Sequence, residues 1–375
     1  MAQSPPLIPL RLPAEALDIL RAQVLEDHNG CVDPARFPFT FHSPSHPDLA
    51  RLREQERLDD VVAPAASHLD KVLALKRWAA LSTPARSGRR YPTWTAWRLL
   101  EQIRNGDDII VFCGHSAQLF LQACCALGIQ ARYLEVGNKA NPYCHFLTEV
   151  FLEDFGRWAI VDPTPGGAFN AYFLRDGVPQ NALELHQAYL SGDSAGLTVV
   201  HDAQVCDPSQ DAPVPHILPM YYYFRVLFTQ DHQTVGPPYF DLENTFARYE
   251  EAVEWEDDLT VPWCENPDTT NYRLPHRRLT RRSTSDAPDL YWRPTDQTEM
   301  ELRWLRDTDF RLRLRTLCPD LDCFLVRLDG GAWERRLDIS AWSPGLGEHT
   351  IEARTLTGAG HEGPAASLRF RLSPP

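Results

Sequence analysis

Apolar residues in the first half of the chain recur with the period of an α-helix. Between about residues 65 and 81 they lie three or four positions apart, which predicts an amphipathic helix, and a second helix is predicted over 94–104. Residues 116–127 are apolar nearly all round and are followed by Gly128, so this segment is predicted to be a buried central helix with a glycine cap. A shorter helix is predicted over 14–26.

Beyond the central helix the period changes to two. Alternating residues predict strands over 131–136, 145–152 and 157–162, with turn residues between them. A central helix packed against antiparallel strands is an α+β arrangement. We therefore expect an α+β core over residues 61–205, with residues 1–60 as a proline-rich N-terminal extension that packs on it.

The rest of the chain divides at the basic stretch RRLTRRSTSDAP, near residue 285. Residues 206–284 lose clear periodicity, carry many prolines and include the run Tyr221–Tyr223, so we expect an irregular connecting region. From residue 285 to 375, short alternating segments return between turn residues such as Asp329-Gly330-Gly331. Several short strands in about 90 residues predict an all-β, immunoglobulin-like sandwich.

Composition and charge narrow the classes of function. Apolar residues make up 43% of the 375 residues and charged residues 23%, which is typical of a folded globular protein. The formal net charge of −14 repels phosphate backbones and anionic lipids, so nucleic acid is not an expected partner. The uncharged block 109–131 is long enough to cross a bilayer, but its glutamines, glycines and His115 make it too polar, so no membrane span is expected.

The expected location is the cytoplasm. The first residues, MAQSPPLIPLRLP, lack the basic start and uninterrupted apolar stretch of a secretion signal. Nine cysteines, two of them adjacent at Cys124 and Cys125, do not resemble a disulfide framework and favour a reducing compartment.

Cys113 stands where a nucleophilic cysteine would be placed. It follows the apolar run IIVF and opens the predicted central helix. A thiol at a helix N-terminus lies near unpaired backbone N–H groups and the positive end of the helix dipole, and both favour the thiolate. The thiolate is the form that attacks a carbonyl carbon.

His145 and Asp162 flank a predicted hairpin. His145 begins one strand and Asp162 ends the next. A turn made of Glu153 and Asp154 would place the two side chains directly opposite each other. A shift of register by two residues leaves them diagonal on one face, whereas a shift by one residue separates them. On a shared face the carboxylate would orient the imidazole, whose other nitrogen would face the thiol.

These segments resemble a known family. The stretch CGHSAQLFLQACCALGIQARYLEV, followed by HFLTEVFLEDFGRWAIVDPT, is similar to the core of the transglutaminase-like superfamily, which has a papain-like fold. The similarity covers about residues 65–190, and AYFLRDGVPQNALELHQAYLSGD and the C-terminal segments resemble uncharacterised bacterial members. The chain departs from the family in having Val111 where glycine is frequent.

The resemblance implies a catalytic triad. Cys113 would be the nucleophile, His145 the general base and acid, and Asp162 the residue that orients the histidine. Trp78 resembles, by its spacing from Cys113, the indole that donates a hydrogen bond to the oxyanion in the animal enzymes, although a tryptophan on an amphipathic helix is more often part of the core. No cofactor is expected. No metal is expected either, because Cys144 and His145 are neighbours on a predicted strand and point to opposite faces, so they cannot readily bind one ion. The paired Cys-x-x-Cys ligands of the deglycosylating relatives are absent from the sequence, which argues against a peptide N-glycanase role.

The predicted function is thiol-dependent acyl transfer on a peptide or protein amide, through a thioester. Resolution of the thioester by water would make the protein an amidase or peptidase, and resolution by an amine would make it a transferase; hydrolysis is preferred because no acceptor site is identifiable. The alternative is a non-catalytic peptide- or glycan-binding protein that retains the fold. The substrate and the oligomeric state stay open.

Overall fold

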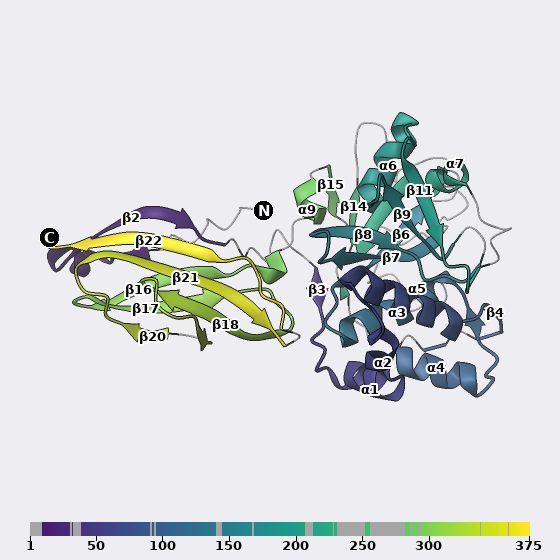
Figure 1. Ribbon diagram of the computed structural model, residues 1–375, viewed down its shortest axis with the longest axis horizontal. Helices are drawn as coiled ribbons and strands as arrows, with labels where there is room; N and C mark the ends of the chain where they lie inside the picture. Colours follow the sequence, from purple (N-terminus) through teal and green to yellow (C-terminus); the bar gives the residue numbers. More distant parts are fainter. Residues whose placement is uncertain are drawn as a thin grey trace. The chain divides into compact units, whose positions relative to one another are not determined.

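A computed structural model of the chain provides the fold. It describes residues 10–30, 32, 39–90, 92–93, 95–139, 145–166, 169–206, 213–227, 229–230, 252–255, 282–285, 287–291, 294–337, 339–358 and 360–375. The chain divides into two compact units, which are described separately below (Figure 1). One unit spans Phe39–Tyr291, and the other combines Met1–Pro38 with Trp292–Pro375.

The first unit has a helical layer. Its helices are α1 (Pro47–Gln55), α2 (Leu58–Val62), α3 (His68–Ser82), α4 (Ala96–Arg104) and α5 (Cys113–Ala126). The helices predicted over 65–81, 94–104 and 116–127 are confirmed as α3, α4 and α5, although Trp94 itself lies outside the described residues. In α5 every residue after Cys113 is buried, as its nearly uniform apolar sequence predicts, and Gly128 ends the helix with a φ of 73°.

The second layer of this unit is a mainly antiparallel sheet with the order β10-β9-β8-β7-β6-β12-β14-β15, and β11 pairs with β9. Its strands are β6 (Ala131–Gly137), β7 (His145–Leu152), β8 (Arg157–Val161), β9 (Ala171–Arg175), β10 (Val178–Pro179), β11 (Leu197–His201), β12 (Tyr223–Leu227), β14 (Ala252–Trp255) and β15 (Arg282–Thr284). The three predicted strands are confirmed as β6, β7 and β8.

Alternation along β7 explains how the sheet is covered on both faces. Phe146 and Val150 belong to the core cluster formed with α5, whereas Glu149, on the opposite face, accepts a hydrogen bond from Ala182 at the start of α6 (Ala182–Ser191). Figure 1 shows α1–α5 on one side of the sheet and α6 on the other. The site is therefore built on a central helix and a sheet that are both fixed by buried contacts.

The connecting region contributes regular structure to this unit. β12 pairs with β6 at the centre of the sheet, and the tyrosine run that leads into it is buried. The expectation of an irregular region over 206–284 therefore does not hold for β12, because pairing with a distant strand is not visible in the local pattern. Most of residues 231–281 lies outside the described residues.

Short elements complete the unit: β3 (Thr40–Phe41), β4 (Arg86–Ser87), β5 (Ile110–Val111), α7 (Val214–Ile217), the 3-10 helix Leu218–Met220, β13 (Thr229–Gln230) and α9 (Ala287–Tyr291).

The second unit is a β-sandwich. One sheet has the order β1-β16-β17-β20 and the other β19-β18-β21-β22-β2. Their strands are β1 (Leu10–Arg11), β2 (Arg21–His28), β16 (Glu299–Arg306), β17 (Asp309–Arg315), β18 (Leu321–Leu328), β19 (Glu334–Arg336), β20 (Ile339–Trp342), β21 (Gly347–Thr357) and β22 (Ala366–Ser373), and a 3-10 turn covers Pro294–Asp296. Phe310 of one sheet and Phe370 of the other share one core cluster, so the predicted sandwich architecture is confirmed.

The N-terminal residues differ from the prediction. The helix expected over 14–26 is wrong: Ala14–Asp18 form a 3-10 helix, and Arg21–His28 form strand β2, which pairs with β22. The partner strand lies at the far end of the sequence, so the local pattern does not reveal it. The expected extension, residues 1–60, is divided in the structure, because residues up to Pro38 group with the sandwich and α1 groups with the helical layer.

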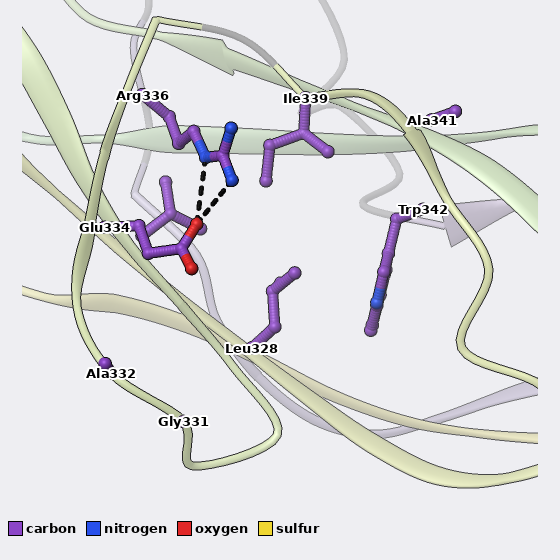
Figure 2. A pocket seen from close by; sticks show the side chains of 9 residues that line it. Leu328, Gly331, Ala332, Glu334, Arg336, Ile339, Ala341 and Trp342 are labelled. Carbon is purple, nitrogen blue, oxygen red and sulfur yellow. Dashed lines mark hydrogen bonds and ion pairs between the residues drawn. The ribbon is translucent and has the colours of Figure 1, made fainter.

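A cavity of about 410 Å³ opens between β18, β19 and β20 of the sandwich (Figure 2). Leu328, Ile339 and Trp342 form apolar parts of its lining. The charged groups of the lining, Glu334 and Arg336, form an ion pair with each other. The lining of the cavity is therefore partly apolar, and its two charged side chains neutralise each other.

Candidate active site

Cys113 is the first residue of α5 and the one partly exposed residue of that helix. Phe112, directly before it, is held by hydrogen bonds that it both donates and accepts. The backbone N–H groups of His115 and Ser116 donate to the carbonyl oxygen of Phe112, and the Phe112 N–H donates to Nδ1 of His115. The Tyr133 hydroxyl on β6 donates to the carbonyl oxygen of Gly114, 3.2 Å away. A free thiol is thus held at the positive end of a rigid helix.

His145 and Asp162 form a buried pair. Nε2 of His145 lies 2.6 Å from Oδ2 of Asp162, and the two residues are 2% and 4% exposed. Leu152 pairs with Arg157, so the turn between β7 and β8 contains four residues rather than the two that a directly opposite placement requires. This register leaves His145 and Asp162 diagonal on one face, the second of the arrangements considered above.

The structure pairs two of the three predicted triad residues, His145 and Asp162, and Cys113 acts electrostatically on that imidazole. Because Asp162 contacts Nε2 of His145, Nδ1 is the ring nitrogen that remains for another partner. Burial acts to lower the pKa of His145, but the charge of Asp162, its hydrogen bond and a hydrogen bond with Cys113 outweigh burial and raise that pKa to about 10. The imidazole is therefore protonated at neutral pH.

Neighbouring groups hold the pair in place. Oδ1 of Asp162 accepts a hydrogen bond from the Thr164 N–H at 2.9 Å, and the Asp162 N–H donates to the carbonyl oxygen of Ala171. The ring of Phe169 stacks on His145 with centroids 4.2 Å apart. The sequence analysis missed Thr164 and Phe169; the Asp-Pro-Thr sequence signals such a turn at Asp162, but nothing local indicates that Phe169 covers the imidazole.

Trp78 lies on α3, half-buried against the helical core. Packing against the core explains why a tryptophan stands at this position. The role of Trp78 as an oxyanion donor stays a prediction. At the start of α5 the N–H groups of His115 and Ser116 already donate to Phe112. The N–H groups of Cys113 and Gly114 are therefore the backbone candidates for binding an oxyanion formed beside Cys113.

Within the part of the chain that the structure describes, no group of three or more His, Cys, Asp or Glu side chains is placed to hold a metal ion. The same described residues contain no helix that is long and apolar enough to cross a membrane.

The charged pair should make stability depend on pH. A histidine whose pKa rises on folding contributes stability that is complete below about pH 6.5 and is lost as the pH rises through about 10. From pH 6.5 to 9.5 we expect the wild type to lose about 2–4 kcal/mol relative to the His145→Gln variant. Urea unfolding of both proteins at the two pH values measures this, and the subtraction cancels the titration of all other groups. An equal change in both proteins would show that His145 is not charged in the folded state.

Comparison with known proteins relates one region of the chain to a known family. Residues 55–163 match the family model described as the transglutaminase-like superfamily. The matched segment includes α5, β7 and β8, and therefore the positions of Cys113, His145 and Asp162. A search of curated proteins finds no significant match.

Proposed function

Since residues 55–163 form a transglutaminase-like region, in a superfamily that generally performs cysteine-based acyl transfer or hydrolysis, we propose that the protein is a cysteine-dependent amidase acting on peptide or protein amides. The observation that carries this proposal is the buried hydrogen bond between His145 and Asp162, together with a partly exposed Cys113, at the start of a buried helix, whose thiol acts electrostatically on that imidazole. A partly exposed sulfur beside an imidazolium is the arrangement that nucleophilic catalysis requires.

The chemistry follows from the geometry. The Cys113 thiolate attacks the amide carbonyl carbon, and the backbone N–H groups of the first turn of α5 stabilise the resulting oxyanion. The protonated His145 donates its Nδ1 proton to the leaving nitrogen, the C–N bond breaks, and a thioester remains on Cys113. The neutral imidazole then takes a proton from water, whose oxygen attacks the thioester carbonyl carbon and releases a carboxylic acid and the Cys113 thiolate.

Asp162 orients the imidazole through these steps and favours its charged form before the proton is donated. Its carboxylate is buried and fixed by Thr164, so the imidazole ring has little freedom to turn away from the thiol. The non-catalytic binding protein is the weaker alternative, because a buried charged pair costs free energy and a binding role gives it no use.

An acyl-enzyme experiment tests the proposal. Incubation with p-nitrophenyl acetate should release a rapid burst of p-nitrophenolate and leave an acetyl thioester on the peptide that contains Cys113, detected by mass spectrometry. The Cys113→Ala variant is the blank, and Cys318→Ala is the matched control, since Cys318 is also partly exposed but lies in the sandwich. Acetylation spread equally over Cys113 and Cys318 would contradict the proposal. Adding a primary amine then separates hydrolysis from transfer.

A further inference from the structure

Phe169 is an aromatic side chain beside the triad that the mechanism above does not use. It is half-buried in the loop between β8 and β9, and its ring stacks on the imidazole of His145. The two ring centroids are 4.2 Å apart, and the ring planes differ by 22°. One face of the imidazole is therefore covered by the face of a phenyl ring.

The same loop provides the carboxylate and the phenyl ring. Asp162 lies at its start, and the Asp162 N–H donates to the carbonyl oxygen of Ala171, so the two ends of the loop are held together. Within the loop, the Phe169 N–H donates to the carbonyl oxygen of Gly166 at 2.9 Å. Phe169 thus returns to contact His145, whose Nε2 is bound by Asp162.

The backbone around Phe169 is held in place by further contacts. Its carbonyl oxygen accepts a hydrogen bond from Nδ1 of His201 at 3.0 Å and from the thiol of Cys206 at 3.8 Å. Asn170, the next residue, is fully buried with a left-handed φ of 60°, which asparagine tolerates better than most residues. These contacts give the phenyl ring a fixed place over the imidazole.

A second histidine of this unit makes a different contact with a phenylalanine. His115 on α5 meets Phe112 edge-on, with ring planes 76° apart and centroids 4.4 Å apart. His115 is neutral, because burial lowers its pKa to about 3. Neutral rings commonly meet edge to face, whereas a cation is held over the face of a ring. The contact at Phe169 therefore suits a charged imidazole, and the contact at Phe112 suits a neutral one.

We propose that Phe169 is a positioning residue for the triad, whose phenyl face stabilises the positive charge of the His145 imidazolium and keeps the ring in line with Asp162. The face of a phenyl ring attracts a cation within about 6 Å of the ring centroid. This contact leaves both ring nitrogens of His145 available, with Nε2 bound to Asp162. The inference rests on the proposed function, because that function makes the imidazolium the proton donor to the leaving nitrogen.

The other groups that act on the charge of His145 are Asp162 and, with a smaller effect, Cys113. Strands β6 and β8 pair with β7, and α3 and α5 pack against it. The remaining charged or titratable groups on these five elements are Arg132, Tyr133, Glu135, Glu149, Arg157, His68, Asp70, Lys71, Lys76, Arg77, His115, Cys124 and Cys125. All of them are unchanged in the Phe169 variants described next, so a difference between variants reports the phenyl ring.

The first test is the titration of His145, followed by NMR of labelled histidine. The signal is assigned by its absence in His145→Gln, and the proteins that are titrated carry Cys113→Ala, so that no thiol at position 113 titrates in the same range. Phe169→Leu keeps an apolar side chain but removes the aromatic face, so the pKa of His145 should fall by about 0.5–1 pH unit. Phe169→Tyr should restore the pKa, and Phe155→Leu, at a 40% exposed phenylalanine of the same unit, should not change it. Equal pKa values in Phe169→Leu and Phe155→Leu would overturn the inference.

The second test keeps the shape of the side chain and changes only its charge distribution. Phenylalanine at position 169 is replaced by a series of fluorinated phenylalanines, because each added fluorine makes the face of the ring less negative. The pKa of His145 should then fall with the number of fluorine atoms. A pKa that does not depend on fluorination would overturn the inference. Since these rings are nearly the same size as the native one, the test decides the question even if Phe169→Leu does not fold.

The two tests separate this inference from the proposed function, because both read His145 and neither needs a reactive thiol. An unchanged pKa of His145 in a protein whose Cys113 is acetylated by p-nitrophenyl acetate would overturn the inference alone. A pKa that falls as expected, in a protein whose Cys113 is inert, would contradict the proposed function instead. Phe169 would then stabilise an imidazolium that has no catalytic use.

Discussion

Replacing Asp162 by asparagine is expected to slow alkylation of Cys113 about 10- to 100-fold at pH 6.5. The amide is isosteric and its oxygen can still accept from Nε2 of His145, so the ring should keep its place, but the negative charge that raises the pKa of His145 to about 10 is lost. With a neutral imidazole, an ordinary thiol near pKa 8.5 is about 1% thiolate at pH 6.5. The greater nucleophilicity of a more basic thiolate recovers part of the loss.

The pH profile distinguishes this effect from misfolding. The Asp162→Asn variant should approach the wild-type rate above about pH 9, where the thiol ionises without help. A misfolded variant would differ from the wild type at every pH. Asp193→Asn is the control, since Asp193 forms an exposed pair with Arg175 on the surface of the same unit. A wild-type rate at pH 6.5 in Asp162→Asn would mean that the thiolate does not depend on this carboxylate.

The parts of the site that the sequence predicts are those encoded by neighbouring residues. The sequence predicts the place of Cys113 because an apolar strand, a cysteine and a buried helix follow one another, and the structure has this order. His145 and Asp162 were predicted because period-two segments place them at the ends of adjacent strands. The sequence does not predict the length of the turn between them, because Glu153–Gly156 can form a two-residue or a four-residue turn. In the structure Leu152 pairs with Arg157, which makes it a four-residue turn.

Features that depend on distant residues were not predictable. The sequences of β2 and β12 carry only weak strand patterns. β2 forms a strand by pairing with β22, and β12 forms one by pairing with β6. Lys76 lies on the apolar face of its helix, four residues after Val72 and three before Ala79, but a lysine in a sequence is expected to be exposed, and its burial follows from how α3 packs. Local pattern therefore predicts the candidate site residues, whereas strand pairing between distant segments and the burial of Lys76 depend on tertiary packing.

The sheet that positions His145 and Asp162 is held by a buried ion pair. Arg132 of β6 is fully buried, and its Nε and Nη2 donate to Oε2 of Glu149 on β7 at 2.8 and 2.5 Å. Nη1 of Arg132 donates to the carbonyl oxygen of Leu290, and the guanidinium lies 4.3 Å from the ring centroid of Trp158. Oε1 of Glu149 accepts from the Ala182 N–H at the start of α6. The ion pair thus joins β6 and β7 to the start of α6 and to Leu290 of α9.

Glu149→Gln is expected to reduce the free energy of unfolding of this unit by about 3–5 kcal/mol, because it leaves the guanidinium buried without a counter-charge. The melting temperature should fall by about 6–20 °C, measured by circular dichroism. Arg89→Met, which breaks an exposed pair with Asp108, should cost less than about 1 kcal/mol.

The double variant Arg132→Met/Glu149→Leu separates the cost of a lone charge from the value of the pair. Because two apolar groups of similar volume leave no buried charge, this protein should unfold at a higher temperature than Glu149→Gln. A double variant less stable than Glu149→Gln would show instead that the hydrogen bonds to Leu290 and Ala182 are worth more than the cost of burying a lone guanidinium. In that case the pair would stabilise the sheet mainly by joining its segments, and the position of His145 on β7 should be disturbed together with the stability, which the alkylation rate of Cys113 in the same variants would report.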